Sequence, residues 1–149
     1  MKIFLDTNVL LYMVRGRKTY FVETFGLDNP SNRVYTSIVS IGEMRALSLR
    51  HNWGTSKKQE MERLFRTFPS LDINVNDIFN RYAEIDAFSQ GRLIGRPRVG
   101  SSRIMGKNDL WIASTASFIN ATLVTTDKDF DHLDTEFLRV AYVEQSLIV

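Results

Sequence analysis

Four acidic residues that lie far apart in the sequence are candidates for a single site: Asp6, Glu43, Asp109 and Asp127. Asp6 directly follows a short apolar run that ends at Leu5, and Asp127 directly follows the segment 123–126. Each of these segments predicts a buried strand. Ligands of an open parallel α/β sheet bind just beyond the carboxyl ends of its strands, so both acids are expected at one edge of the sheet. Taken singly, either aspartate is explained better as the N-cap of a helix.

Glu43 lies inside a helix that is predicted to begin after Ser37. The residues at positions i−4, i+3 and i+4 from it are all apolar: Val39, Ala46 and Leu47. That spacing places Glu43 on the stripe of the helix that faces the core. A buried carboxylate without a partner costs several kcal/mol or becomes protonated, so a cation is expected opposite it. An arginine or a lysine would meet this need, and so would a metal ion.

Asp109 shows the same pattern at the beginning of a later helix. Its neighbours at i+3, i+4 and i+7 are Ile112, Ala113 and Ala116, which predicts that Asp109 begins an inward-facing stripe. It also lies in the first helical turn, where the helix dipole favours a negative charge, and a simple capping role is the alternative explanation. Two inward-facing acids in the opening turns of their helices should converge with the two acids at the strand ends.

Four converging carboxylates repel one another strongly unless cations lie between them. Oxygen ligands select hard ions, so Mg²⁺ or Mn²⁺ is the expected cofactor. The chain has no cysteine, and His51 and His132 lack the spacing of metal ligands, which argues against a zinc site or a Ser-His-Asp triad. The expected chemistry is therefore metal-assisted hydrolysis of a phosphodiester bond.

Two further groups of residues could assist these acids. Some polar side chains could orient the carboxylates, although capping and turn roles explain each of them at least as well: Thr7, Asn8, Ser37, Asn108 and Thr125. The stretch from Gly91 to Asn108 carries five cations and no acid. Four of these cations are candidates for contacts with a nucleic-acid backbone: Arg96, Arg98, Arg103 and Lys107. A solvated, glycine-rich surface loop is the alternative.

Strands that alternate with helices predict an α/β fold with a central parallel sheet covered on both faces. The predicted strands cover residues 2–5, 33–36, 71–75, 121–126 and 138–143. The predicted helices cover residues 9–14, 38–50, 56–68, 76–93 and 109–119, and Asn108 is expected to cap the last of them.

The bulk properties fit one globular domain over residues 1–149. The chain is 44% hydrophobic and 24% charged, and it contains no internal repeat, low-complexity segment or linker. The apolar run at the N-terminus is too short for a signal peptide or a membrane span, and Asp6 interrupts it. A cytoplasmic protein is therefore expected, and the absence of cysteine fits a reducing compartment.

Four segments of the chain resemble the motifs of PIN-domain proteins, and more closely those of VapC-type toxins of toxin–antitoxin pairs. In chain order the segments are Ile3–Leu10, Thr36–Met44, Asn108–Ala113 and Thr125–Phe130. The resemblance covers nearly the whole chain and implies a three-layer α/β/α sandwich with the activity of a divalent-metal ribonuclease. The metal-site acids that it implies are Asp6, Glu43, Asp109 and Asp127. Asp129 resembles the family's structural turn and is the candidate to replace Asp127 as the fourth acid.

The same resemblance implies partners. Relatives of this kind form homodimers, and their antitoxins insert a C-terminal segment, often with an arginine or a lysine, into the acidic cleft. The expected partners are therefore an RNA substrate, a cognate antitoxin and a second copy of the chain.

Three other functions remain open at this point. A housekeeping RNA-processing nuclease would use the same acids, and the sequence does not separate it from a toxin. A degenerate PIN domain that binds RNA or protein is harder to reconcile with the presence of all four acids. A phosphatase of the haloacid dehalogenase type also begins with an aspartate after its first strand, but it needs a second aspartate where this chain has Asn8.

Overall fold

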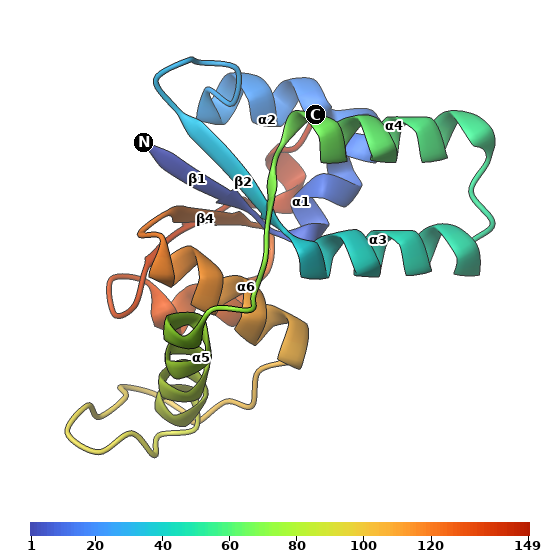
Figure 1. Cartoon of the computed structure of the whole chain (residues 1–149). Helices are drawn as coiled ribbons and strands as arrows, with labels where there is room; N and C mark the ends of the chain where they lie inside the picture. The colour runs from blue at the N-terminus through green and yellow to red at the C-terminus, as the bar shows by residue number, and fades with distance from the viewer.

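A computed structural model describes all residues from 1 to 149, and its centre is a sheet of five parallel strands in the order β3-β2-β1-β4-β5 (Figure 1). The strands are β1 (Lys2–Leu5), β2 (Arg33–Ser37), β3 (Ser70–Leu71), β4 (Thr122–Thr125) and β5 (Arg139–Tyr142). In the middle of the sheet, Phe4 of β1 pairs with Tyr35 of β2 and with Leu123 of β4. The carboxyl ends of β1 and β4 therefore lie side by side, just before Asp6 and Asp127.

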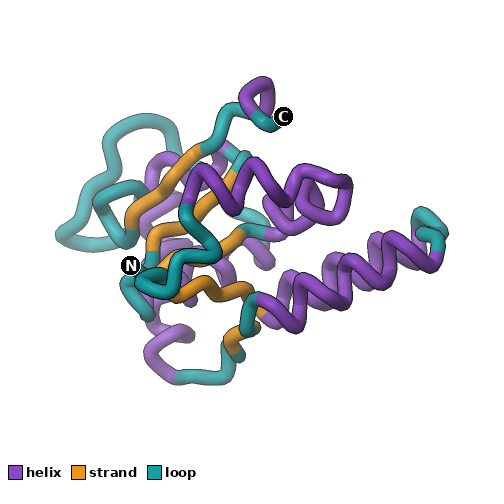
Figure 2. The backbone as a smooth tube through the Cα atoms, turned by 90° about the horizontal axis from the view of Figure 1, so that it is seen from above, coloured by secondary structure: helices purple, strands orange, loops and turns teal.

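Helices cover both faces of this sheet, which confirms the predicted α/β/α sandwich (Figure 1). The α-helices are α1 (Thr7–Tyr12), α2 (Lys18–Phe25), α3 (Ile38–Arg50), α4 (Thr55–Thr67), α5 (Asn76–Ser89) and α6 (Lys107–Phe118). Shorter helical segments are η1 (Met13–Arg17), η2 (Lys128–Leu133) and η3 (Gln145–Leu147). Figure 2 shows that α3 and α4 project beyond the edge of the sheet. No helix in the structure has both the length and the apolar character that crossing a membrane requires.

The two central strands are buried on both faces. Ile3 and Leu5 of β1 belong to a hydrophobic cluster with residues of α1, α2 and α4, whereas Phe4 belongs to a second cluster with residues of α5, α6 and η2. In β4, Val124 belongs to the first cluster and Leu123 to the second. Burial on both faces explains why these strands are continuous apolar runs in the sequence rather than alternating patterns.

Some predicted boundaries are wrong. The strand predicted over residues 71–75 is only the two-residue β3, because the Asp72 carboxylate accepts the backbone N–H of Asn74 (3.0 Å) and turns the chain away from the sheet. Helix α5 ends at Ser89 instead of residue 93, and Gly91 then adopts a left-handed conformation (φ 71°). The first helix begins at Thr7, two residues earlier than predicted.

Candidate active site

Asp6 is the first residue after β1 and the N-cap of α1. Its Oδ1 accepts the backbone N–H of Thr7 (2.8 Å), and its Oδ2 accepts the hydroxyl of Thr125 (2.7 Å). Only 3% of the residue is exposed. Burial raises the pKa of Asp6 from 3.8 to about 6; the two hydrogen bonds oppose this rise, and the charges of Asp127 and Glu43 add to it. Asp6 therefore caps a helix and also faces two other carboxylates.

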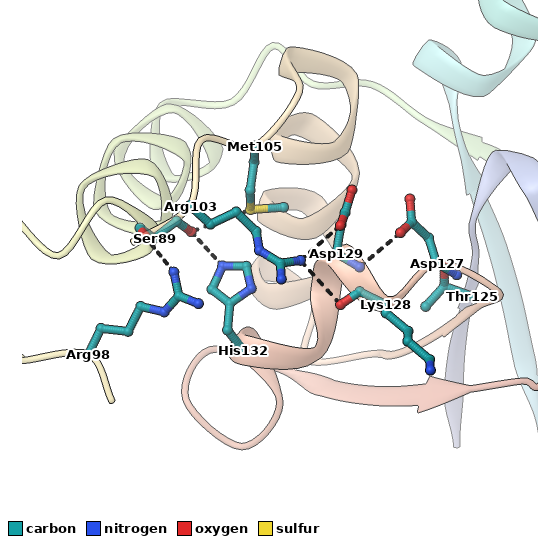
Figure 3. Close-up of polar contacts among 9 residues, drawn as sticks. All are labelled: Ser89, Arg98, Arg103, Met105, Thr125, Asp127, Lys128, Asp129 and His132. Carbon is teal, nitrogen blue, oxygen red and sulfur yellow. Dashed lines mark hydrogen bonds and ion pairs between the residues drawn. The ribbon is translucent and has the colours of Figure 1, made fainter. Parts of the chain in front are cut away.

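Thr125, the last residue of β4, connects Asp6 with Asp127. Besides donating to Asp6, its hydroxyl accepts the backbone N–H of Asp127 (3.0 Å). Asp127 in turn caps η2, since its Oδ1 accepts the backbone N–H of Asp129 (2.8 Å; Figure 3). The two acids predicted at neighbouring strand ends thus share one hydroxyl partner, although 119 residues separate Thr125 from Asp6.

Glu43 reaches the site from α3 through a hydrogen bond with Thr7. The Thr7 hydroxyl donates to Glu43 Oε1 (2.9 Å) and lies 2.7 Å from the hydroxyl of Ser40. The prediction that Glu43 lies on the core-facing stripe is wrong, because Glu43 is only half-buried and Ala46 of that stripe is exposed. The buried residues of α3 form a neighbouring stripe: Ser40, Met44 and Ser48.

The stripe that carries Glu43 lines a groove between α3 and α6. The groove has a volume of about 570 Å³, and its walls include Val39 and Leu47 of α3 and Trp111 of α6. Glu43 and Asn108 contribute polar groups to the same walls. The apolar neighbours that suggested a core position for Glu43 therefore belong to an open surface next to the acids.

Asp109 is the third residue of α6. The helix begins at Lys107 with Gly106 as its N-cap, so the prediction that Asn108 caps it is wrong. The stripe below Asp109 is fully buried, as predicted: Ile112, Ala113 and Ala116. Burial first, and then the charges of four other acids, raise the pKa of Asp109 from 3.8 to about 7. In order of their effect these acids are Asp6, Asp127, Glu43 and Asp129.

Three of the carboxylates lie close enough together to share one cation. One oxygen atom from each of Asp109, Asp127 and Asp129 lies within 4.8 Å of the other two. Hard divalent ions bind several carboxylate oxygens at once and fill their remaining positions with water or phosphate oxygens. The donor set, which comes from the first turn of α6 and the turn after β4, therefore fits such an ion. Burial and, after it, the charges of the neighbouring acids raise the pKa of Asp109, a member of this cluster, so a bound cation would favour its ionised form.

Among the polar residues predicted to orient the acids, two are hydrogen-bonded to them. Thr125 contacts Asp6 and Asp127, and Thr7 contacts Asp6 and Glu43. The other three make no such bond. The Ser37 hydroxyl accepts the backbone N–H of Val39 (3.1 Å) and so caps α3. Asn8 and Asn108 are exposed, and neither side chain makes a hydrogen bond to an acid. No sequence pattern identifies Ser40, whose contact with Thr7 depends on how α1 and α3 pack.

Two of the four predicted phosphate-binding cations, Arg96 and Lys107, make no contact with the acids of the site. Arg96 donates to the backbone carbonyl of Glu136, and its guanidinium lies over the ring of Phe137, 4.0 Å from the ring centroid. Lys107, in the first turn of α6, is exposed and makes no ion pair. Arg96 is therefore tied to the segment before β5, and Lys107 is free in solvent.

The other two predicted cations lie beside the acids. Arg103 Nη1 forms an ion pair with Asp129 Oδ1 (2.8 Å; Figure 3). Arg98 Nη1 donates to the backbone carbonyl of Ser89 (2.7 Å), at the end of α5. Of the four cations, Arg103 is the one that the fold brings into direct contact with a member of the acidic cluster.

His132 is half-buried between the basic residues. Its Nε2 lies 2.7 Å from the hydroxyl of Ser89, and its ring is stacked on Phe88 with an interplanar angle of 7°. Burial, together with the charges of Arg98 and Arg103, lowers the pKa of His132 from 6.5 to about 4. The imidazole is therefore neutral near neutral pH and does not add a third positive charge.

Comparisons with known proteins agree with this architecture. The family model described as "PIN domain" matches residues 3–136. Ribonuclease VapC1 of Haemophilus influenzae is 27% identical over 130 residues, which cover 87% of this chain and 90% of that protein.

Two solved toxin–antitoxin complexes contain a chain of similar fold. VapBC2 from Rickettsia felis, bound to a DNA fragment from its promoter, has a TM-score of 0.73 and 21% identity, and VapBC-1 from nontypeable Haemophilus influenzae has a TM-score of 0.71 and 25% identity. In both cases the match covers 95% of this chain and 98% of the other chain. The family resemblance predicted from the four sequence motifs is thereby confirmed, and this chain belongs to the PIN-domain family.

Proposed function

We propose that this chain is a divalent-metal-dependent endoribonuclease and the toxin of a toxin–antitoxin pair. The observation that carries the proposal is the acidic cluster at the carboxyl edge of the sheet, where oxygens of Asp109, Asp127 and Asp129 lie within 4.8 Å of one another. PIN nucleases depend on a metal, and the similar protein from Haemophilus influenzae is named a ribonuclease. Hydrolysis of RNA is the chemistry that such a cluster supports best.

In this proposal four acids hold Mg²⁺ or Mn²⁺: Asp6, Glu43, Asp109 and Asp127. When bound, the ion supplies an acidified water as nucleophile and polarises the phosphoryl oxygen. The chain itself contributes fixed negative charge in a defined geometry. Hydrogen bonds from Thr7 and Thr125 hold both oxygens of Asp6, and the Asp127 carboxylate is held by the backbone N–H that it caps. Asp129, the third member of the observed cluster, forms an ion pair with Arg103 and is the alternative to Asp127 as the fourth metal ligand.

RNA is proposed to cross the acidic cluster between the groove beside α3 and the basic residues on the other side. Lys107 lies two residues before Asp109 and is exposed, so it can reach a phosphate close to the cluster. Arg96 already contacts Glu136 and Phe137, and it is expected to contribute less to RNA binding than its place in the sequence suggests.

A cognate antitoxin is proposed to cover the same site, since the two similar solved structures are toxin–antitoxin complexes. A basic side chain of the antitoxin would complement the acids, and apolar side chains would fit the groove lined by Val39, Leu47 and Trp111. A homodimer is proposed on the same family resemblance.

Cleavage of RNA by the purified protein tests this function. The protein is expected to cleave cellular RNA in Mg²⁺ or Mn²⁺, to stop when EDTA is added, and to resume when the metal is restored. The product of an adjacent antitoxin gene, added in excess, should stop cleavage as well. A simple phosphate monoester should not be hydrolysed. If RNA stays intact with both metals while the protein still binds it, the chain is a binding scaffold and the nuclease proposal is wrong.

Replacing Thr7 with valine is expected to slow RNA cleavage about tenfold or more, because loss of a residue that orients a metal ligand has effects of this size. Valine keeps the shape of the side chain but removes the hydroxyl that donates to Glu43. The free energy of unfolding should fall by only about 1 kcal/mol, the contribution of a typical hydrogen bond.

Ser40→Ala is the matched control, because it removes the hydroxyl next to Thr7 and leaves the Thr7–Glu43 bond in place. Cleavage rates and urea denaturation of both variants give the comparison. Equal cleavage rates for Thr7→Val and Ser40→Ala would contradict the role of Thr7 in orienting Glu43.

A further inference from the structure

The loop of residues 90–106, which we call the basic loop, joins α5 to α6 and folds back against the end of α5. The backbone N–H of Arg103 and the side chain of Arg98 both donate to the carbonyl of Ser89, at 2.7 Å each. Figure 3 shows the result: the two guanidinium groups lie on either side of His132, next to the turn that carries Asp127 and Asp129. Two arginines that are far from Asp127 and Asp129 in the sequence are thus fixed beside them.

Positive charge is concentrated at this point and only partly compensated. Arg103 has a carboxylate partner in Asp129, but Arg98 forms no ion pair. Burial and the charge of Arg103 lower the pKa of Arg98, which indicates that the two guanidinium groups repel each other. Arg98 Nε is buried without a hydrogen-bond acceptor, and His132 Nδ1 is buried without a hydrogen-bond partner. Buried polar atoms without partners are rare in folded proteins, and here they accompany an excess of positive charge.

Arg103 uses only one of its terminal nitrogens in these contacts. Nη1 donates to Asp129 Oδ1 (2.8 Å) and lies 3.4 Å from the carbonyl oxygen of Lys128, while Nε and Nη2 make no hydrogen bond within the protein. A guanidinium can bind two acceptors at once, because its planar donors form two separate edges. The edge formed by Nε and Nη2 is therefore available for a bidentate contact with an anion.

We propose that Arg98 and Arg103 form a subsite for a backbone phosphate of single-stranded RNA, adjacent to the acidic cluster. Arg103 keeps Nη1 on Asp129 and turns its free edge toward the phosphate, and Arg98 supplies the second positive charge. Phosphate contacts of this kind fix the position of a strand without reading its bases. The two arginines are thus positioning residues, which set where the RNA backbone lies relative to the acids. This inference rests on the proposed function for its substrate.

Binding of RNA in the absence of cleavage tests the subsite directly. Variants are made in the Asp6→Asn background, and the probe is a random-sequence pool of short, fluorescent, single-stranded oligoribonucleotides whose anisotropy is followed over a range of salt concentrations. Arg103→Ala and Arg98→Ala are each expected to weaken binding about tenfold. Each should also reduce the slope of log K against log salt by about 0.7, the value for one phosphate contact with a single strand.

Two further variants separate a phosphate contact from other effects. Arg139→Ala is the matched control, since Arg139 is an exposed arginine at the opposite end of the sheet and should change neither the affinity nor the slope. Arg103→Lys should restore the salt slope but only part of the affinity, because lysine keeps the charge and loses the bidentate edge. Circular dichroism and thermal unfolding establish that each variant is folded.

Several outcomes would overturn the subsite. The subsite is wrong if Arg103→Ala and Arg98→Ala bind RNA as tightly as Arg139→Ala does. It is also wrong if they bind RNA more weakly but with an unchanged salt slope, because the arginines would then only hold the loop in place. A loss of antitoxin binding with unaltered RNA binding would also exclude it. These results are independent of catalysis: a wild-type protein that cuts no RNA would refute the proposed nuclease while the binding data still decide the subsite.

Discussion

The Asp6→Asn protein is expected to cleave RNA at least about a thousandfold more slowly than the wild type, because a bound metal contributes several kcal/mol to transition-state stabilisation. Asp6 is the most buried of the acids, and both of its oxygens are already held by hydrogen bonds. Asparagine can keep the contact with the Thr7 N–H and can place its amide against the Thr125 hydroxyl. The substitution therefore removes the charge of one metal ligand and leaves the local structure in place.

The same substitution is expected to stabilise the metal-free protein. The pKa of Asp6 is raised from 3.8 to about 6, so the folded protein holds this proton more tightly than the unfolded chain does. The free energy of unfolding consequently decreases as the pH rises from about 4 to about 6, by about 3 kcal/mol, and stays low above that range. An amide does not ionise, so Asp6→Asn should regain up to about 3 kcal/mol at neutral pH and lose this part of the pH dependence.

Urea denaturation in EDTA and RNA cleavage in Mg²⁺ measure the two effects in one set of samples. Asp28→Asn, in an exposed turn away from the site, is the control and should change neither quantity. Undiminished cleavage by Asp6→Asn would remove Asp6 from the proposed site. A protein that is inactive but less stable than the wild type would mean that Asp6 serves mainly as a helix cap.

The fold could be predicted from the sequence wherever burial is continuous. The strands β1 and β4 were located to within one residue, because each is buried on both faces and ends at a polar residue. The strand β3 was predicted too long, because its pairing depends on β2 and its end depends on a local turn at Asp72. Hydrophobic periodicity does not encode either of these features.

Glu43 lies beside the other acids for a different physical reason than its neighbours in the sequence suggest. Those apolar neighbours predict a buried stripe, but in the structure they line an open groove. An apolar stripe on a helix does not distinguish a core contact from an exposed groove. The two acids that follow strands were placed by topology alone, and the structure brings them together through Thr125.

The contacts of the basic loop could not be predicted from the sequence. The ion pair between Arg103 and Asp129 spans 26 residues, and the contact of Ser89 with His132 spans 43. Both depend on the way the loop folds back on the end of α5, and no periodic pattern or motif specifies that path. The sequence indicates an excess of cations before Asp109, and the structure shows that Arg98 and Arg103 are the ones that lie beside Asp127 and Asp129.

Metal affinity is expected to fall steeply as the medium becomes acidic. Asp109 and Asp6 must both lose a proton to act as ligands, and their pKa values are about 7 and about 6 in the metal-free protein. Below about pH 7 each bound ion must displace the proton of Asp109, so affinity should decrease about tenfold per pH unit. Below about pH 6 a second proton comes from Asp6, and the decrease should approach about a hundredfold per unit.

Isothermal titration calorimetry with Mn²⁺, in pairs of buffers that differ in ionisation enthalpy, measures both the affinity and the number of protons released. The Asp109→Asn protein is the matched comparison, and it should bind Mn²⁺ more weakly at neutral pH. Its affinity should no longer fall between about pH 7 and about pH 6, because Asp109 causes that step. The fall in affinity below about pH 6, which Asp6 causes, should remain. As the pH falls, the metal-free protein should therefore become more stable while its affinity for the metal decreases. Protonation of the acids relieves the same repulsion that a bound cation neutralises. An affinity for Mn²⁺ that stays constant between about pH 5 and about pH 7 would show that these two buried acids are not its ligands.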